Sequence, residues 1–209
     1  MIVAVVGSGG KTTYIREQAK IYLAQGKRVL VTTTTHMYAE ADTLFTNDAE
    51  EICACLQEHG YCMAGQRAES AGETRTDGRL KGGSVSSERG EHTKICALSP
   101  EVLSRAAQCA DVVLVEADGA KGKAVKFPAA HEPVIPESTD TIVIVMGFFS
   151  VGQTVGEACH RQEQVCRCLG VSPSHRLTEA DLQKLVDEGY RRPLSRLYPQ
   201  AKIILKKSL

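Results

Sequence analysis

Short apolar runs recur along the chain and are separated by segments of mixed polarity. They cover residues 2–6, 29–33, 112–117 and 141–146 and are rich in valine and isoleucine. Apolar runs of four to seven residues, with no polar alternation, are typical of strands buried on both faces of a parallel sheet. Runs of this kind that alternate with helices predict an α/β fold.

Helical spacing and capping residues predict the elements between these runs. Apolar side chains three or four positions apart, or a Ser, Thr, Asp or Asn ahead of them, mark helices that span or begin at residues 14–25, 48–58, 99, 157–169 and 178. Two further short strands are predicted at 61–64 and 202–205. Residues 65–93 are mostly glycine, serine and charged residues, which favours a loop or ragged hairpin, the most mobile part of the chain.

The first strand runs directly into a glycine-rich turn, which we interpret as a phosphate-binding loop. Glycines let the backbone approach an anion, and the N-terminus of the following helix adds a partial positive charge. Lys11 would reach the β- and γ-phosphates, and the Thr12 hydroxyl would ligate Mg²⁺. The alternative is a glycine turn with a chance lysine. The predicted nucleotide-contacting residues of the loop are Gly7, Ser8, Gly9, Gly10, Lys11, Thr12 and Thr13.

The loop is a shortened form of the usual pattern, because Val5 stands where the first glycine is expected. It is similar to the Gly-x-x-Gly-Lys-Thr-Thr loop of the Mur ligases and folylpolyglutamate synthases, which hold ATP. Right-handed crossovers would bring the carboxyl ends of all four strands to one edge of the sheet. We therefore expect a P-loop NTPase-like three-layer αβα sandwich with a mostly parallel sheet over residues 1–150. Residues 151–209 would form a small helical extension packed on it, either separate or part of the same domain.

Other polar residues follow the strands at this edge. Thr34, Thr35 and His36 end the second strand, where ligands bind in open α/β sheets, although threonine also favours strands for its own sake. Glu116 and Asp118 end the third. They alternate to the same face and would repel each other unless a cation lay between them. We expect them to serve catalysis with Lys11 and to hold Mg²⁺ or its water; the alternative is a pair of solvated turn residues.

A basic, glycine-bearing turn comes next and suggests a second anionic group, either the far end of the nucleotide or the substrate. Lys121 lies in this turn, and a proline-rich segment after it would hold His131 and Glu132 in place. The alternative is that the lysines of this turn only keep the edge of the site soluble.

The overall charge narrows the possible partners. Lysine plus arginine equals aspartate plus glutamate at 25 each, so no global field would recruit nucleic acid or an acidic membrane. No apolar run reaches 18 residues, and we expect a cytoplasmic protein. The eight cysteines include no Cys-x-x-Cys pair, and we expect no disulfide. A zinc site is a minor alternative, formed by Cys159, His160, Cys166 and Cys168.

Four motifs in fixed order resemble the YqeC family of accessory proteins of selenium-dependent molybdenum hydroxylases. They are Val6-Gly-Ser-Gly-Gly-Lys-Thr-Thr13, Val31-Thr-Thr-Thr-Thr-His-Met37, Val115-Glu-Ala-Asp-Gly-Ala-Lys-Gly122 and Pro128-Ala-Ala-His-Glu-Pro-Val-Ile-Pro136. The resemblance implies a nucleotide-binding protein tied to selenium and molybdenum cofactor chemistry, with that cofactor or a client hydroxylase as partner. Lys206 stands where the family's Asn-Lys-x-Asp-like element has its asparagine, so the base, ATP or GTP, stays open.

Three functions remain. The first is an NTP-dependent enzyme, an ATPase or a ligase-like or kinase-like transferase, in cofactor maturation, because positioning and electrostatic stabilisation are nearly all that phosphoryl transfer asks of a protein. The second is a nucleotide-gated module that binds or inserts a cofactor. The third is a metal carrier that uses its Cys and His residues.

Overall fold

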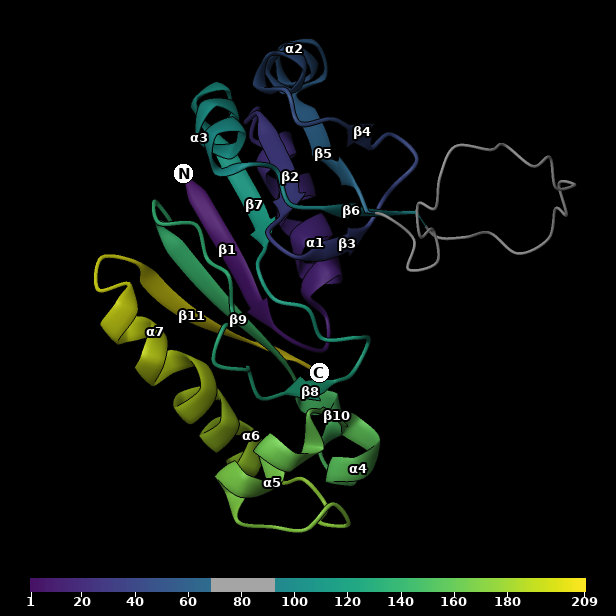
Figure 1. Cartoon of the computed structure of the whole chain (residues 1–209), viewed down its shortest axis with the longest axis vertical. Helices are drawn as coiled ribbons and strands as arrows, with labels where there is room; N and C mark the ends of the chain where they lie inside the picture. Colours follow the sequence, from purple (N-terminus) through teal and green to yellow (C-terminus); the bar gives the residue numbers. More distant parts are fainter. Residues whose placement is uncertain (69–92) are drawn as a thin grey trace, which may run out of the picture.

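The computed structural model describes residues 1–68 and 93–209 (Figure 1). In these residues a nine-stranded sheet has the order β11-β9-β1-β7-β2-β5-β6-β3, with β4 paired to β5. A small second sheet pairs β8 with β10 in parallel. The strands are β1 (Ile2–Gly7), β2 (Val29–Thr33), β3 (His36–Tyr38), β4 (Leu44–Phe45), β5 (Tyr61–Arg67), β6 (Lys94–Cys96), β7 (Val112–Glu116), β8 (Val125–Lys126), β9 (Thr141–Gly147), β10 (Cys159–His160) and β11 (Lys202–Ser208).

The four predicted core strands are confirmed as β1, β2, β7 and β9, and they are mutually parallel. The predicted strand near 202–205 is also confirmed, as β11, which lies parallel to β9 at the edge of the sheet. Among the strands that the structure describes, the antiparallel pairs are those that β6 forms with β5 and β3. The carboxyl ends of the central strands therefore meet at one edge, as right-handed crossovers require.

Helices cover both faces of the sheet (Figure 1). Alternation along β1 shows the division, because Ala4 and Val6 pack in the cluster that includes Ile52 of α2 and Leu182 of α6, whereas Val3 and Val5 pack with Ile15 of α1. This arrangement agrees with the expected layered α/β fold. The helical segments are α1 (Lys11–Ala24), α2 (Ala49–His59), α3 (Pro100–Cys109), η1 (Phe148–Ser150), α4 (Val155–Ala158), α5 (Gln162–Leu169), α6 (Glu179–Val186), η2 (Asp187–Arg191) and α7 (Arg192–Leu197).

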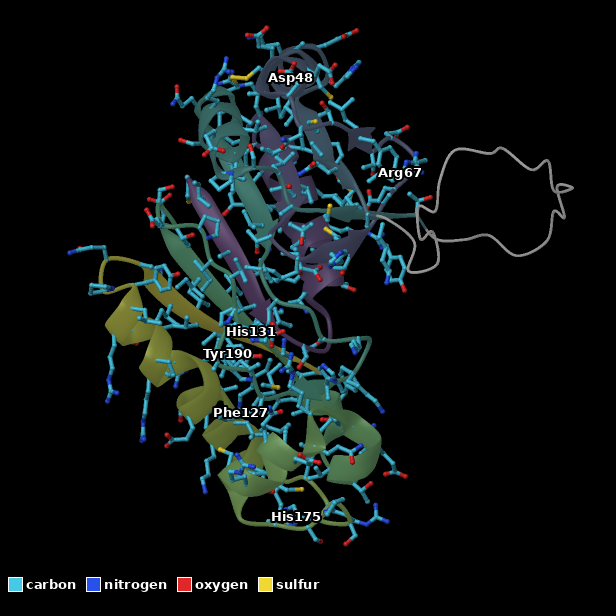
Figure 2. The ribbon with its side chains drawn as sticks, viewed as in Figure 1. Asp48, Arg67, Phe127, His131, His175 and Tyr190 are labelled. Carbon is cyan, nitrogen blue, oxygen red and sulfur yellow. A yellow bond between two sulfur atoms is a disulfide. The ribbon has the colours of Figure 1, made fainter. Side chains whose placement is uncertain are left out.

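Three predicted helix caps are confirmed. Asp48 accepts a hydrogen bond from the backbone N–H of Glu50, and Ser99 accepts one from Val102. Thr178 forms a capping box at the start of α6. Figure 2 shows Asp48 and His175 at opposite ends of the molecule, with Tyr190 of η2 between them.

The single helix expected over residues 157–169 is wrong. Cys159 and His160 pair with Val125 and Lys126 as β10 and β8, which ends α4, and Arg161 then takes a left-handed conformation with φ 61° before α5 begins. Pairing with a strand more than 30 residues away overrides the local helical pattern.

The segment after residue 150 is more than a helical extension, because β11 within it completes the main sheet. β11 and β9 are paired over seven positions, from Lys202 with Thr141 to Ser208 with Gly147. Of the loop or hairpin expected over 65–93, residues 69–92 lie outside the described residues. Residues 65–67 belong to β5, which pairs antiparallel with β6, the strand that follows this segment. Within the described ranges, no helix has the length and apolar character needed to cross a membrane.

The expectation that no disulfide forms is also wrong for this structure. Cys53 of α2 and Cys109 of α3 are bonded, with their Cα atoms 5.4 Å apart. The cause is the packing of α2 against α3, which brings together two thiols 56 residues apart. As for the zinc alternative, no group of three or more His, Cys, Asp or Glu residues in the described part of the chain is arranged to hold a metal ion.

Candidate functional site

The glycine loop (residues 7–10) connects β1 to α1 at the carboxyl edge of the sheet. Gly7, Gly9 and Gly10 have φ values of 91°, 72° and 122°, which side-chain-bearing residues rarely adopt. A Cβ on Gly7 would lie 2.1 Å from the carbonyl oxygen of Val145. No side chain caps α1 at Gly10, so the partial positive charge of the helix N-terminus faces this edge.

Lys11, the first residue of α1, is buried and points back over the loop. Its Nζ donates to the carbonyl oxygen of Gly7 at 3.0 Å and lies 3.8 Å from Oε1 of Glu116. The Thr12 hydroxyl donates to Oε2 of the same carboxylate at 3.0 Å. Burial lowers the pKa of Lys11, against the opposing charges of Glu116 and Asp118, and burial raises the pKa of Glu116. The loop, the lysine and one acid thus form a single buried cluster.

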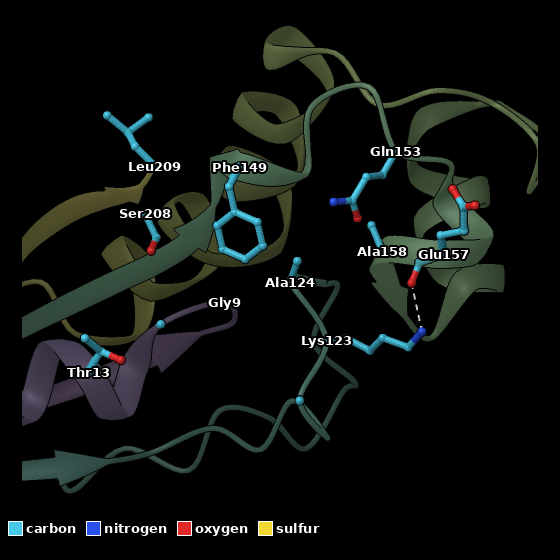
Figure 3. A pocket seen from close by; sticks show the side chains of 12 residues that line it. Gly9, Thr13, Lys123, Ala124, Phe149, Gln153, Glu157, Ala158, Ser208 and Leu209 are labelled. Carbon is cyan, nitrogen blue, oxygen red and sulfur yellow. Dashed lines mark hydrogen bonds between the residues drawn. The ribbon is translucent and has the colours of Figure 1, made fainter.

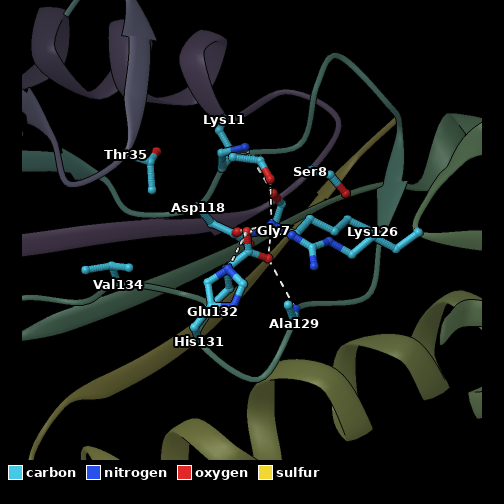
Figure 4. Close-up of polar contacts among 12 residues, drawn as sticks. Gly7, Ser8, Lys11, Thr35, Asp118, Lys126, Ala129, His131, Glu132 and Val134 are labelled. Atoms are coloured by element: carbon cyan, nitrogen blue, oxygen red, sulfur yellow. Dashed lines mark hydrogen bonds and ion pairs between the residues drawn. The ribbon is translucent and has the colours of Figure 1, made fainter. Parts of the chain in front are cut away.

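Asp118 contacts a different set of residues. Its Oδ2 accepts hydrogen bonds from the backbone N–H of Gly7 at 3.1 Å and from the hydroxyl of Tyr190 at 2.9 Å. Its Oδ1 is ion-paired with Lys126, and both side chains are fully buried (Figure 4). The two acids were expected to need a shared cation; instead, each carboxylate has its own lysine, Lys11 for Glu116 and Lys126 for Asp118.

The ion pair of Asp118 continues into the C-terminal part of the chain. Lys126 Nζ lies 2.7 Å from Oε2 of Glu132, and Arg161 donates to Oε1 of Glu132 at 2.9 Å. Although burial opposes it, hydrogen bonds from Lys126 and from the backbone of Ala129 lower the pKa of Glu132. Hereafter, the fully buried Asp118 and Lys126 together with the partly buried Glu132 and Arg161 are called the buried ion chain. It connects the glycine loop to the start of α5.

The threonine run joins β2 to neighbouring segments. Thr34 donates its hydroxyl to the carbonyl oxygen of Val134 at 2.5 Å, and Thr33 donates to that of Glu116 at 2.8 Å. The backbone N–H of Thr35 donates to the Thr33 hydroxyl at 2.9 Å, and the two hydroxyl oxygens lie 3.4 Å apart. Thr34 and Thr35 therefore lie at the expected edge, with Thr34 tied to the proline-rich segment.

The other predicted site residues differ in how far they are buried. Ser8 is buried, and its N–H donates to the carbonyl oxygen of Val145 at 2.9 Å. Thr13 is exposed on the first turn of α1. Three more of these residues are exposed: His36 on β3, Lys121 in the turn after β7, and His131 beside Glu132.

A cavity of about 640 Å³ opens beside the glycine loop (Figure 3). One wall comes from the loop and α1, and the others come from the turn before β8, from the segment 149–158 and from the end of β11. It is lined by Gly9, Gly10, Thr13, Gly122, Lys123, Ala124, Phe149, Gln153, Glu157, Ala158, Ser208 and Leu209.

Sequence reasoning did not select several residues that shape this site. Lys126 is one of several lysines in and after the basic turn, and no local pattern in the sequence distinguishes it from the others as the buried one. Tyr190 stands at helical spacing from Leu182 and Val186, so its pattern indicates only a core position. Its contact with Asp118 spans 72 residues and has no signature in the sequence.

Fold and site together describe an α/β protein with a glycine loop and a buried lysine at the carboxyl edge of a mostly parallel sheet. The family model described as "YqeC protein" matches residues 3–163, and the chain belongs to this family. It is 31% identical over 194 residues to the "Uncharacterized protein YqeC" of Escherichia coli (strain K12), a match that covers 88% of this chain and 67% of that relative. The comparison with solved structures finds no match.

Proposed function

We propose that this protein binds a nucleoside triphosphate, ATP or GTP, with Mg²⁺ at the glycine loop. The position of Lys11 carries the proposal. Its buried ammonium lies beside the carbonyl oxygen of Gly7 and near Glu116, at the start of a helix that no side chain caps. A cation and a free helix N-terminus that face the same point suit a polyphosphate.

Thr12 and Glu116 fit the accompanying metal. Mg²⁺ at nucleotide sites takes only one or two protein oxygens and fills its other positions with phosphate and water. The Thr12 hydroxyl and Glu116 carboxylate, 3.0 Å apart, supply such a pair without a larger cluster. Bound there, Mg²⁺ would neutralise charge that develops on the phosphates. Asp118 is occupied by Lys126, Tyr190 and Gly7, so we assign it to holding the loop in place.

The reaction that suits this site is NTP hydrolysis or a phosphoryl-coupled transfer. Lys11 would hold the β- and γ-phosphates, and the low-dielectric surroundings would strengthen its interaction with charge in the transition state. The family resemblance suggests the purpose of the reaction: maturation, in the cytoplasm, of a selenium or molybdenum cofactor or of its client hydroxylase.

A second candidate is a nucleotide-gated binding module with little intrinsic catalysis. The buried ion chain favours it, because Asp118 contacts the N–H of Gly7 at one end and Arg161 lies at the start of α5 at the other. A change in the loop on nucleotide binding could therefore shift the C-terminal helices.

Phosphate release from MgATP and MgGTP tests the two candidates. An enzyme should release phosphate in a Mg²⁺-dependent reaction that a small acceptor accelerates. A gated module should bind nucleotide but release phosphate only when a client protein is added. If the purified protein neither binds nor hydrolyses either nucleotide, both candidates are wrong.

A further inference from the structure

We propose that the cavity beside the glycine loop is the nucleoside subsite, and that Phe149 is the platform on which a purine base stacks. This inference rests on the proposed function and adds to it where the non-reacting end of the nucleotide binds. The cavity, its aromatic wall and its mixed polarity each support the assignment.

The cavity lies directly beside the loop that is proposed to hold the phosphates. The cavity shares Gly9, Gly10 and Thr13 with the loop and the first turn of α1. The groups suited to the reacting phosphates, Lys11 and Glu116, are not among its lining residues. A nucleoside triphosphate has its reacting γ-phosphate at one end and its nucleoside at the other. When the γ-phosphate lies against Lys11, the cavity receives the other end.

Phe149 gives the cavity an aromatic wall. Phe149 is 51% exposed although it is a large apolar residue, and its ring projects into the cavity beside Ala124 (Figure 3). Gly147 permits this placement, because a Cβ there would lie 2.7 Å from the carbonyl oxygen of Ala124 and 3.0 Å from the ring. Nucleic-acid bases stack on aromatic rings that have an open face, and any base can do so because every base has a π-face.

The size and polarity of the cavity also suit a nucleoside. A volume of about 640 Å³ lies within the range of small-molecule sites. Lys123 donates to the carbonyl oxygen of Glu157 at 2.8 Å and so joins two of the walls. The amide of Gln153 lies on the wall across from Phe149 and can both donate and accept hydrogen bonds (Figure 3). One aromatic face together with amide and hydroxyl groups suits a base and ribose better than an acyl chain.

Calorimetric titration of Phe149 variants tests the inference. MgATP, MgGTP and magnesium triphosphate without a nucleoside would be titrated into the wild type, Phe149→Ala and Phe149→Tyr. We expect Phe149→Ala to weaken the better-bound nucleotide about fivefold or more, the usual cost of a lost base stack, and to leave triphosphate binding unchanged. Phe149→Tyr keeps the ring and should bind like the wild type.

Phe45→Ala is the matched control. Phe45 is also a partly exposed phenylalanine, but it lies on β4 under the guanidinium of Arg67, 4.2 Å from the ring centre, and should not affect nucleotide binding. Far-UV circular dichroism would verify that each variant is folded. If Phe149→Ala were unfolded, Phe149→Leu, which keeps apolar bulk without the ring, would replace it.

Two results would overturn the inference. One is magnesium triphosphate binding to the wild type as tightly as either nucleotide, and the other is unchanged nucleotide affinity in Phe149→Ala. In both cases the glycine loop still binds phosphate, so the proposed function stands while the nucleoside subsite is lost. If none of the three ligands binds the wild type, the proposed function itself fails, and the subsite with it.

Discussion

The Thr12 hydroxyl donates a hydrogen bond to the Glu116 carboxylate across 3.0 Å, joining the first turn of α1 to the end of β7. The two residues are 104 positions apart, and β1, which lies parallel to β7 in the sheet, brings them together. Lys11 lies 3.8 Å from the other oxygen of the same carboxylate. A hydroxyl, a carboxylate and an ammonium therefore lie together, as the proposed site for Mg²⁺ and a phosphate requires.

Glu116→Gln should separate binding from turnover. Glutamine keeps the shape of the side chain but removes the negative charge that is proposed to bind Mg²⁺. We expect NTP turnover to fall about 100-fold or more with little change in nucleotide affinity, because the lost interaction forms mainly in the transition state. Phosphate release and calorimetry on the same sample would measure both quantities. Glu17→Gln, an exposed position on α1, is the control. Wild-type turnover in Glu116→Gln would remove this carboxylate from the mechanism.

Asp118→Asn should chiefly destabilise the fold. The substitution removes the charge that faces buried Lys126, although Glu132 stays within 2.7 Å of that lysine. Removal of one partner from a buried ion pair costs about 3 kcal/mol or more of unfolding free energy. Urea unfolding would measure the loss, with exposed Asp42→Asn as the control. A variant as stable as the wild type would show that the buried ion chain contributes little to stability.

Gly7→Ala should be much more damaging than Gly26→Ala. Both glycines have positive φ, 91° and 71°, so both alanines carry the same kind of backbone strain, about 1 kcal/mol. A Cβ at Gly7 would also meet the carbonyl oxygen of Val145 at 2.1 Å, whereas a Cβ at Gly26 has open space. We expect Gly7→Ala to lose about 2 kcal/mol more in denaturant unfolding. Equal losses would mean that the loop is not held against β9.

The ion pair between Arg28 and Asp111 should give a measurable pH dependence. Hydrogen bonds from the Arg28 side chain and backbone lower the pKa of Asp111 from 3.8 to about 2. A carboxyl group whose pKa is lower in the folded state stabilises the fold above its unfolded pKa and loses that contribution as the pH falls. Between pH 4 and about pH 2, the wild type should therefore lose more thermal stability than Asp111→Asn. Parallel pH profiles would contradict the pairing.

The sequence predicted the core strands and the glycine loop because both are local signals. Val3 and Val5 lie in an apolar run, and Lys11 follows its glycines directly. The failures all involve distant partners. Cys53 bonds with Cys109 because α2 packs on α3, and Cys159 pairs with Val125 as β10 and β8, which breaks a helical pattern.

The same reason explains what was missed in the site. The spacing at the end of β7 predicted that both acids lie at the carboxyl edge of the sheet, but it could not predict which residues contact each of them. Glu116 and Asp118 have different partners, because Asp118 contacts Tyr190 and Lys126 whereas Glu116 contacts Thr12 and Lys11. The contacts of Asp118 depend on how the C-terminal part packs against the sheet, which no local pattern encodes.

Nucleotide binding by Lys11→Ala tests the central claim most directly. Calorimetry with MgATP and MgGTP would compare the wild type, Lys11→Ala and Lys20→Ala, the last an exposed lysine on the same helix. Loss of the buried ammonium should weaken the better-bound nucleotide about 100-fold or more, because Lys11 is the cation proposed to hold the β- and γ-phosphates. Lys20→Ala should bind like the wild type. Unchanged affinity in a folded Lys11→Ala protein would show that the glycine loop is structural and that the function lies elsewhere.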